Sequence, residues 1–349
     1  MIRHHRTLLA LLACCVLLAP HISAQTGTEA PKYSNEFLKI GIGARAFGMG
    51  NTQTAVAEDV TAGYWNPAGL ASEGALPYPE VSAMHASYFA NIANYNYIGF
   101  ALPIDSAGSR RFGATLIRMG IDDIPNTLKL IEPDGTINYD RIQSFSETSL
   151  ALLLSYAWRP GIVKGLSMGA NVKIIYRGVG RFANAWGFGL DLAARYRKGP
   201  FMAGVTLMDA TQTYNAWTFN TETFEEDFIN TGNVVPQNSI EITRPSLRTG
   251  VAWDFKLARK LSLLVAVDND IYLDGNRSSA LVKGSGFSLD PRVGAELALL
   301  NQLYRKVAFL RGGVYNIQNI TNLDGEAAVG LFPTAGVGIV VKNFQIDYA

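Results

Sequence analysis

Hydrophobic and polar positions alternate along much of this chain, which is the pattern of β-strands. In the stretch 165–177 the positions between the apolar residues are mainly polar or glycine, and the apolar residues are Leu166, Met168, Ala170, Val172, Ile174 and Tyr176. Successive side chains of a strand point to opposite faces of a sheet, so this stretch predicts a strand with one apolar and one polar face. The same alternation recurs in 149–158, 185–197, 247–255 and 344–348.

The number and length of the predicted strands favour a barrel. Further strands are predicted at 81–90, 95–103, 111–120, 201–208, 261–271, 291–299, 307–315 and 335–341, roughly thirteen in all. Several run to about ten residues, the length that a tilted membrane strand needs. A single-chain barrel normally has an even number of strands, so we expect about fourteen, with the last one missing from this sequence. The alternative is that one weak strand is miscounted.

The polar face of these strands carries glycine and isolated charges of both signs. Five of the charges are predicted to face the lumen: Asp191, Arg195, Arg248, Arg292 and Glu296. Charged pairs that fill the lumen, such as Asp191 with Arg195, would favour a closed scaffold, whereas a continuous apolar path beneath the plug would favour transport. Alternation alone does not say which face is inside, and a soluble secreted sandwich would bury the apolar one. Strand length, an export signal and aromatic residues such as Trp158, Trp186 and Tyr196 at the ends of the apolar face favour a membrane barrel with that face outward.

Tight turns and long loops separate the strands, as in outer-membrane barrels. The long connections are predicted at Ile121–Ser144, Asp209–Thr243, Tyr272–Asp290 and Asn316–Phe332. The longest, Asp209–Thr243, mixes aromatic with acidic residues and is a candidate partner-contact loop through Tyr214, Trp217, Phe219, Phe224 and Phe228. The alternative is a lid that folds over the barrel mouth.

A glycine-rich stretch, Gly41–Leu70, precedes the strands and is predicted to pack inside the barrel as a plug. Glycine allows sharp bends and close backbone approach. The candidate plug residues are Gly41, Gly43, Arg45, Gly48, Gly50, Asp59, Trp65, Asn66, Pro67 and Gly69. The expected organisation is a signal peptide at 1–24, a plug or hatch at 25–80 and a barrel at 81–349.

The N-terminus predicts export by a cleaved signal peptide. A basic start, an apolar run from Thr7 to Pro20 and small residues before Gln25 form that pattern. An uncleaved anchor is one alternative, and lipidation at Cys14 is another that the long apolar run past it disfavours. Cys14 and Cys15 are the two cysteines of the chain, so the mature protein is expected to lack thiols and disulfides.

Composition argues against an enzyme. Of the 4 histidines, only His85 lies outside the signal peptide, within an apolar strand-like segment where a hydrogen-bonded strand residue is the expected role. We therefore expect no catalytic residues, no metal site and no cofactor. The net charge of +1 gives no case for nucleic acid. Gly41–Ala46 loosely matches a dinucleotide motif but lacks a preceding strand, and the acidic run at Asp268–Asp270 is read as a turn.

The stretch FLKIGIGARAFGMGNTQTAVAEDVTAGYWNPAGL, Phe37–Leu70, resembles the N-terminal signature of the PorV/PorQ family of Bacteroidetes-type outer-membrane proteins. The segments at 291–296, 310–313, 335–339 and 343–349 look like that family's C-terminal segments, although Gly69-Leu70 departs from the ending of the PorV motif. The block from Asp59 to Leu70 is also similar to the hatch of FadL-type transporters. Both resemblances imply a barrel of about fourteen strands with an N-terminal plug.

The resemblance implies two functions for a protein of the Gram-negative outer membrane. The first is a PorV/PorQ-like role in type IX protein secretion, with the translocon barrel and sorting-domain cargo proteins as partners. The alternative is FadL-like transport of a hydrophobic small molecule, with the plug gating the lumen. In both, the barrel contacts outer-membrane lipid.

Overall fold

The structure is a computed structural model that describes residues 34–132, 134–230, 232, 234–273, 277, 280–284, 286–321 and 327–349. The predicted signal peptide lies outside the described residues. None of the helices in the described part of the chain is both long and apolar enough to cross a membrane.

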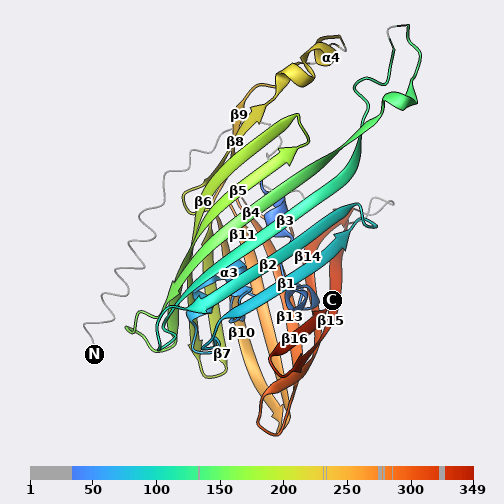
Figure 1. Cartoon of the computed structure of the whole chain (residues 1–349). Helices are drawn as coiled ribbons and strands as arrows, with labels where there is room; N and C mark the ends of the chain where they lie inside the picture. The colour runs from blue at the N-terminus through green and yellow to red at the C-terminus, as the bar shows by residue number, and fades with distance from the viewer. Residues whose placement is uncertain are drawn as a thin grey trace. The chain divides into compact units, whose positions relative to one another are not determined.

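A single antiparallel sheet dominates the fold and curves around the N-terminal segment (Figure 1). Neighbouring strands mostly follow one another in sequence, so hairpins build the sheet. The strands on its continuous path are β1 (Glu80–Tyr88), β2 (Ala93–Pro103), β3 (Arg110–Asn126), β4 (Gln143–Trp158), β5 (Leu166–Val179), β6 (Ala183–Lys198), β7 (Phe201–Met208), β10 (Ser246–Ala258), β11 (Leu261–Tyr272), β13 (Ser288–Leu300), β14 (Lys306–Thr321), β15 (Ala327–Val341) and β16 (Phe344–Tyr348). Three shorter strands lie off this path: β8 (Thr213–Phe219), β9 (Ser239–Thr243) and β12 (Val282–Lys283).

The predicted all-β antiparallel fold of the barrel type is confirmed. The path holds thirteen strands in the described part of the chain, the number that alternation indicates. Within that part, β1 and β16 end the path and are not paired with each other.

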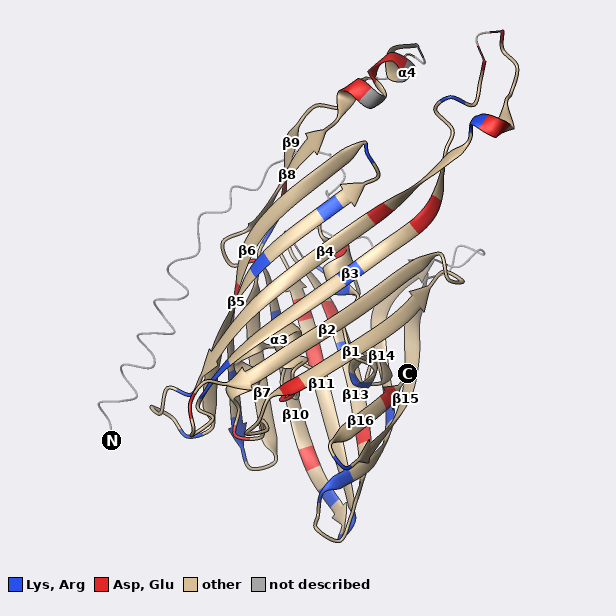
Figure 2. Ribbon diagram, viewed as in Figure 1, with Lys and Arg blue, Asp and Glu red and all other residues tan. Residues whose placement is uncertain are grey.

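The two faces of the strands have the polarity that the sequence predicts for a membrane barrel. On β6, Trp186 and Phe188 are 51% and 60% exposed, whereas Arg195 on the opposite face is 2% exposed. On the neighbouring β5, Lys173 is buried and Val172 is exposed. Figure 2 shows long stretches of the strands without charge and many charged residues in the turns and long connections. The apolar face is therefore outside, and the sparse charges of the polar face point in.

Two of the connections predicted as long loops contain strand residues that the sequence did not predict. Within Asp209–Thr243, β8 pairs with the end of β6 and with β9, and the short helices η4 (Thr221–Thr223) and α4 (Glu225–Asn230) lie between β8 and β9. Within Asn316–Phe332, β14 and β15 continue to Thr321 and from Ala327. Apolar residues do alternate in both places, at Ile240 and Ile242 of β9 and at Val329 and Leu331 of β15, but these runs are short and adjoin polar residues that are typical of loops. In Ile121–Ser144, β3 and β4 also extend beyond their predicted ends, around η3 (Tyr139–Arg141).

The N-terminal segment lies inside the curve of the sheet as four short helices. They are η1 (Glu36–Lys39), α2 (Ala44–Gly48), α3 (Ala62–Trp65) and η2 (Pro67–Ala71). One apolar cluster joins Ile42, Trp65 and Leu70 to inward residues of β2–β5, including Tyr95 and Ile117. A second joins Met49, Ala55 and Val56 to Met202, Ala252, Leu264 and Ala266. The core thus lies between residues 34–71, called the plug below, and the strands of the sheet, called the wall.

Candidate functional site

Glycines let the plug backbone lie directly on the wall. A Cβ on Gly48 of α2 would lie 2.9 Å from Cα of Gly336 on β15, and one on Gly50 would lie 2.8 Å from the backbone nitrogen of Val314 on β14. Gly50 also has φ +59°, a conformation that favours glycine. Wall and plug meet here without intervening side chains.

The remaining plug glycines shape the plug itself. Gly41 has φ +99°, and a Cβ there would lie 3.0 Å from the Trp65 ring. Gly43 has φ +89° with more space around it, so its backbone conformation is what calls for glycine. A Cβ on Gly69 would collide with the carbonyl oxygen of Ala57.

The wall contributes matching glycines that the sequence reading did not single out. Gly169 of β5 meets the backbone of Pro67 and Ala68, and Gly313 of β14 meets that of Met49. Gly204 of β7 and Gly294 of β13 make similar contacts. A signal was present, since glycines recur on the inward positions of strands that are otherwise well patterned.

Trp65, Asn66 and Pro67 join the plug's helices to one another. Trp65 Nε1 donates to the carbonyl oxygen of Ile42 at 3.0 Å. Asn66 caps η2, because its Oδ1 accepts from Ala68 N at 3.1 Å and Pro67 occupies the first turn. Its Nδ2 donates to the carbonyls of Thr54, at 2.9 Å, and of Ala194 on β6, at 3.2 Å. Asn66 is fully buried, so this one amide ties three segments together.

Glu58 ties the plug to β6 through two arginines. Its Oε1 accepts from Arg195 and from Arg197, each at 2.7 Å. Burial alone would raise the pKa of Glu58, but the two guanidinium groups outweigh burial and hold the pKa below its usual value. Arg195 also donates Nε to the carbonyl oxygen of Ala55 at 2.7 Å.

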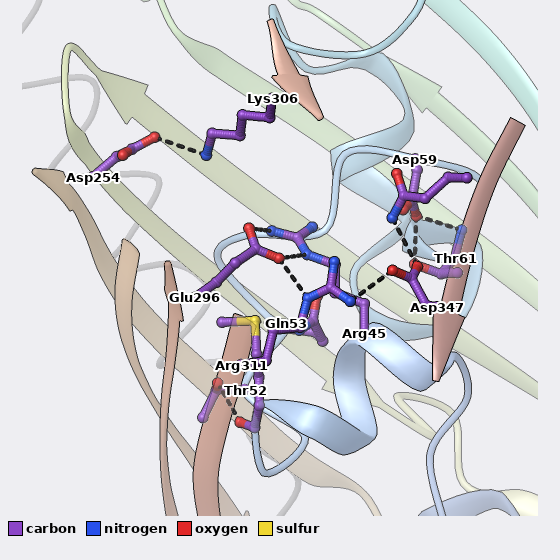
Figure 3. Close-up of polar contacts among 12 residues, drawn as sticks. Arg45, Thr52, Gln53, Asp59, Thr61, Asp254, Glu296, Lys306, Arg311 and Asp347 are labelled. Carbon is purple, nitrogen blue, oxygen red and sulfur yellow. Dashed lines mark hydrogen bonds and ion pairs between the residues drawn. The ribbon is translucent and has the colours of Figure 1, made fainter. Parts of the chain in front are cut away.

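Arg45 ties the plug to β13. It donates Nε and Nη2 to the carboxylate of Glu296 at 2.8 and 3.0 Å (Figure 3). Burial lowers the pKa of Arg45, but Glu296 outweighs burial, so its pKa is raised and the group stays charged. Glu296 also accepts from Arg311 of β14 at 2.8 Å.

A third group of charges lies on β10, β11 and β13. Arg248 donates Nε to Asp270 at 2.9 Å, and Arg292 forms an ion pair with the same carboxylate. The Arg248 guanidinium lies 4.9 Å from the centre of the Trp65 ring, within cation–π range. A charged residue of the wall, Arg248, therefore also contacts Trp65 of the plug.

Asp268 and Asp270 were misread in the sequence as part of a turn. Both lie within β11 on its inward face, and Asp268 Oδ2 accepts from the backbone nitrogens of Gln53 and Thr54, each at 2.8 Å. The Thr54 hydroxyl donates to the same oxygen at 2.6 Å. The signal was the alternation of β11, which continues through both aspartates.

Asp191 and Arg195 do not pair with each other. Asp191 pairs with Lys173 of β5 at 2.8 Å, and Arg195 pairs with Glu58. Two residues four positions apart on a strand lie on one face but about 13 Å apart along it. Their partners therefore come from the neighbouring strand and the plug.

The other predicted residues lie apart from this group. Asp59 Oδ1 accepts from Thr61 N at 2.9 Å, within the plug (Figure 3). Tyr214 of β8 is exposed, Trp217 donates to Glu241 at 3.1 Å, and Trp217 stacks on Phe219. Phe224 is 4% exposed and contacts Phe228 and Phe182, so this part of the predicted contact set is buried.

A large cavity of about 2190 Å³ lies along one side of the plug. The plug, β1 and β13–β16 contribute lining residues, among them Ile42, Met84 and Tyr88. Tyr272 at the end of β11 and Asn301 after β13 both line it, and these points lie at opposite ends of paired strands. The cavity thus runs along the length of the sheet, and residues of the ion pairs, among them Arg45, Asp270 and Arg292, also line it.

His85 is exposed on β1 and its Nδ1 lies 2.8 Å from Asn96 Oδ1, in the strand role that the sequence predicts. Among the described residues, no group of three or more histidine, cysteine or acidic residues could hold a metal ion.

Comparison with known proteins gives the fold. No protein-family model and no curated protein matches the chain. Among solved structures it is similar to the toluene transporter TodX of Pseudomonas putida, with a TM-score of 0.51 and 13% identity over 88% of this chain and 91% of TodX. The monoaromatic hydrocarbon channel CymD gives a TM-score of 0.51 at 12% identity, over 88% and 91% of the two chains. A FadL homologue of Pseudomonas aeruginosa gives 0.49 at 11% identity, over 87% and 88%.

At this identity the likeness establishes a shared fold and leaves activity open. None of these three structures is a PorV/PorQ protein, so the comparisons give that assignment no support.

Proposed function

We propose that this protein is an outer-membrane β-barrel that passes a hydrophobic small molecule through the cavity beside its plug. The observation that carries the proposal is the cavity itself, which runs along the plug from one end of the strands to the other. Its wall includes apolar side chains from the plug and from β1, such as Ile42, Met84 and Tyr88. The lining also includes charged side chains, among them Arg45, Asp270 and Arg292, so the cavity offers apolar contacts together with polar groups that can orient a bound molecule.

The outward surface supports the membrane part of the proposal. Large apolar side chains such as Trp186, Phe188 and Trp253 are exposed on the outside of the strands. Contiguous apolar surface of this kind is unfavourable in water and suits lipid. TodX, a toluene transporter, and CymD, a monoaromatic hydrocarbon channel, have a similar fold, which supports the transport part of the proposal.

The test is uptake of a neutral aromatic dye whose fluorescence rises in an apolar environment. Ala86→Trp places a large ring in the cavity, since Ala86 lies on the inward face of β1 and lines the cavity. Val293→Trp is the matched control, because Val293 is 44% exposed on the outward face of β13. We expect uptake by vesicles containing the wild type and the control, and at least about a tenfold loss with Ala86→Trp. Equal uptake by all three, or none above empty vesicles, would contradict the proposal.

A protein partner is the second candidate function, and one feature favours it. The β8–β9 extension, with α4 at its tip, projects from the sheet (Figure 1). It carries Ile229, Val234 and Ile240 at 61%, 88% and 68% exposure. Exposed apolar residues on a projection suit a protein contact. Type IX secretion stays a prediction from the sequence resemblance. It would gain support if the tagged protein, extracted from outer membranes in detergent, retained a translocon barrel or sorting-domain cargo.

A further inference from the structure

Four alternating charges join the plug to the last strand of the sheet. Arg45 of α2 binds Glu296 of β13 through two hydrogen bonds. Arg311 of β14 donates Nε to Glu296 at 2.8 Å and Nη1 to Asp347 of β16 at 2.6 Å (Figure 3). Glu296 and Arg311 each bind two partners of opposite charge, so the four residues form one connected charge chain from the plug to β16.

The middle of this chain is fully enclosed. The side chains of Glu296 and Arg311 are 1% and 0% exposed, and those of Arg45 and Asp347 are 21% and 18% exposed. Without Arg45 the four-residue group carries one uncompensated negative charge, which is destabilising in an enclosed site. Arg311 is then the one cation of this group that Glu296 and Asp347 must share, so its bond to Asp347 is expected to weaken.

Strand β16 has few other inward contacts. It consists of five residues, of which Asp347 alone is not exposed, and within the described residues it pairs only with β15. Helix α2 lies against this pair of strands: Gly48 packs on Gly336 of β15, and a Cβ on Gly336 would lie 3.1 Å from the carbonyl oxygen of Tyr348. The plug helix and the charge chain thus reach β16 together.

We infer that Arg45 is a positioning residue that holds β16, and with it one border of the cavity, through Glu296 and Arg311. Residues of β1 and of β16 both line the cavity, so a looser β16 leaves the cavity wider on that side. Through Arg45, the position of helix α2 therefore affects how wide the cavity is beside β16. This inference goes beyond the proposed function, because the border is held in this way whatever molecule passes.

The test is hydrogen–deuterium exchange of the peptide that covers Phe344–Tyr348 in the purified full chain in lipid nanodiscs. Arg45→Met removes the charge and keeps most of the side-chain length. Arg197→Met is the matched control, because Arg197 also binds the plug, at Glu58, but from β6. We expect exchange in this peptide to be at least about threefold faster with Arg45→Met and unchanged with Arg197→Met.

Non-additivity separates a connected chain from independent ion pairs. Asp347→Asn should also speed exchange in the peptide, and the double variant with Arg45→Met should exchange no faster than Asp347→Asn alone. Arg45→Lys keeps one charge-assisted bond and should give an intermediate rate, which keeps the inference testable if Arg45→Met fails to fold. Wild-type exchange in Arg45→Met and Arg45→Lys, or additive effects in the double variant, would overturn the inference. Neither readout depends on solute passage, so the inference and the proposed function can fail separately.

Discussion

Single residues hold the plug in two ways. Glycines let the plug backbone lie in contact with the wall, and charged residues form ion pairs between plug and wall. The sequence predicted both kinds of residue, because glycines crowd positions 41–50 and alternation assigns Arg195, Arg248 and Glu296 to the inner face. It could not supply their partners. Gly48 meets Gly336 and Arg45 meets Glu296 across more than half of the chain. Alternation gives the face of a strand but not which residues of a neighbouring strand or of the plug lie at the same level, so it could not predict that Asp191 binds Lys173 and Arg195 binds Glu58.

Gly50→Ala tests the close approach of plug and wall. Gly50 and Gly199 share φ +59°, but a Cβ on Gly50 would meet the backbone of Val314 at 2.8 Å, whereas Gly199 has no neighbour within 4 Å. Both substitutions incur the cost of a left-handed residue, about 1–2 kcal/mol. Overpacking should add about 1–3 kcal/mol to Gly50→Ala alone. Urea unfolding in lipid vesicles measures the difference, and equal losses would show that the plug can move away from the wall without cost.

The pKa of Glu58 predicts how the plug's attachment responds to acid. Its folded-state pKa lies below the usual value of 4.5, so its ion pairs contribute stability that is complete above about pH 4.5. This contribution is lost as pH falls through the folded-state pKa. Glu58→Gln removes the titrating group, so the unfolding free energy of the variant should fall less than that of the wild type between pH 6 and acid pH, on the order of pH 3. Parallel pH curves for the two proteins would show that Glu58 does not contribute in this way.

At the scale of elements, the strands are what the sequence specifies best. Alternation located the strands of the main path and their outward faces, because one face meets an apolar and the other a polar environment throughout. It failed at β8, β9 and the extended ends of β14 and β15, where the alternating runs are short and adjoin polar residues typical of loops. The hydrophobic pattern could not predict the plug helices, since α2 and α3 have only five and four residues, too few to show a helical period.

A charge on the outward face of a strand tests its contact with lipid. Leu190→Arg places a cation on the outer face of β6, among Trp186, Phe188 and Leu192, which are all exposed. Arginine on a lipid-facing site costs about 2–4 kcal/mol near the bilayer midplane. Leu303→Arg is the control, since Leu303 is 74% exposed in the turn between β13 and β14. Folding yield into vesicles should fall for the first variant only, and equal yields would place that face in water.

At the scale of the whole molecule, a sheet with an apolar exterior encloses a plug that fills one side of the interior and leaves a cavity along the other. The plug supplies much of the core, so the interior without it would be lined by charges such as Arg195, Arg248 and Glu296. We expect a chain lacking Gly41–Leu70 to insert, because its outer face is unchanged, and to conduct ions. Planar-bilayer recordings compare it with the intact protein. If the truncated protein inserts equally well but gives no ion current, the segment is not needed to close the barrel to ions.

The central claim is that a hydrophobic molecule occupies the cavity beside the plug. Photolabelling measures this most directly, with a neutral aromatic diazirine applied to the protein in vesicles and the modified residues located by mass spectrometry. Because labelling from the lipid also occurs, unlabelled aromatic competitor distinguishes a saturable site from the bilayer. The account predicts competable labels on cavity residues such as Ile42, Met84, Ala86 and Tyr88. Competable labels confined to outward residues such as Trp186 and Phe188, or none at all, would contradict it.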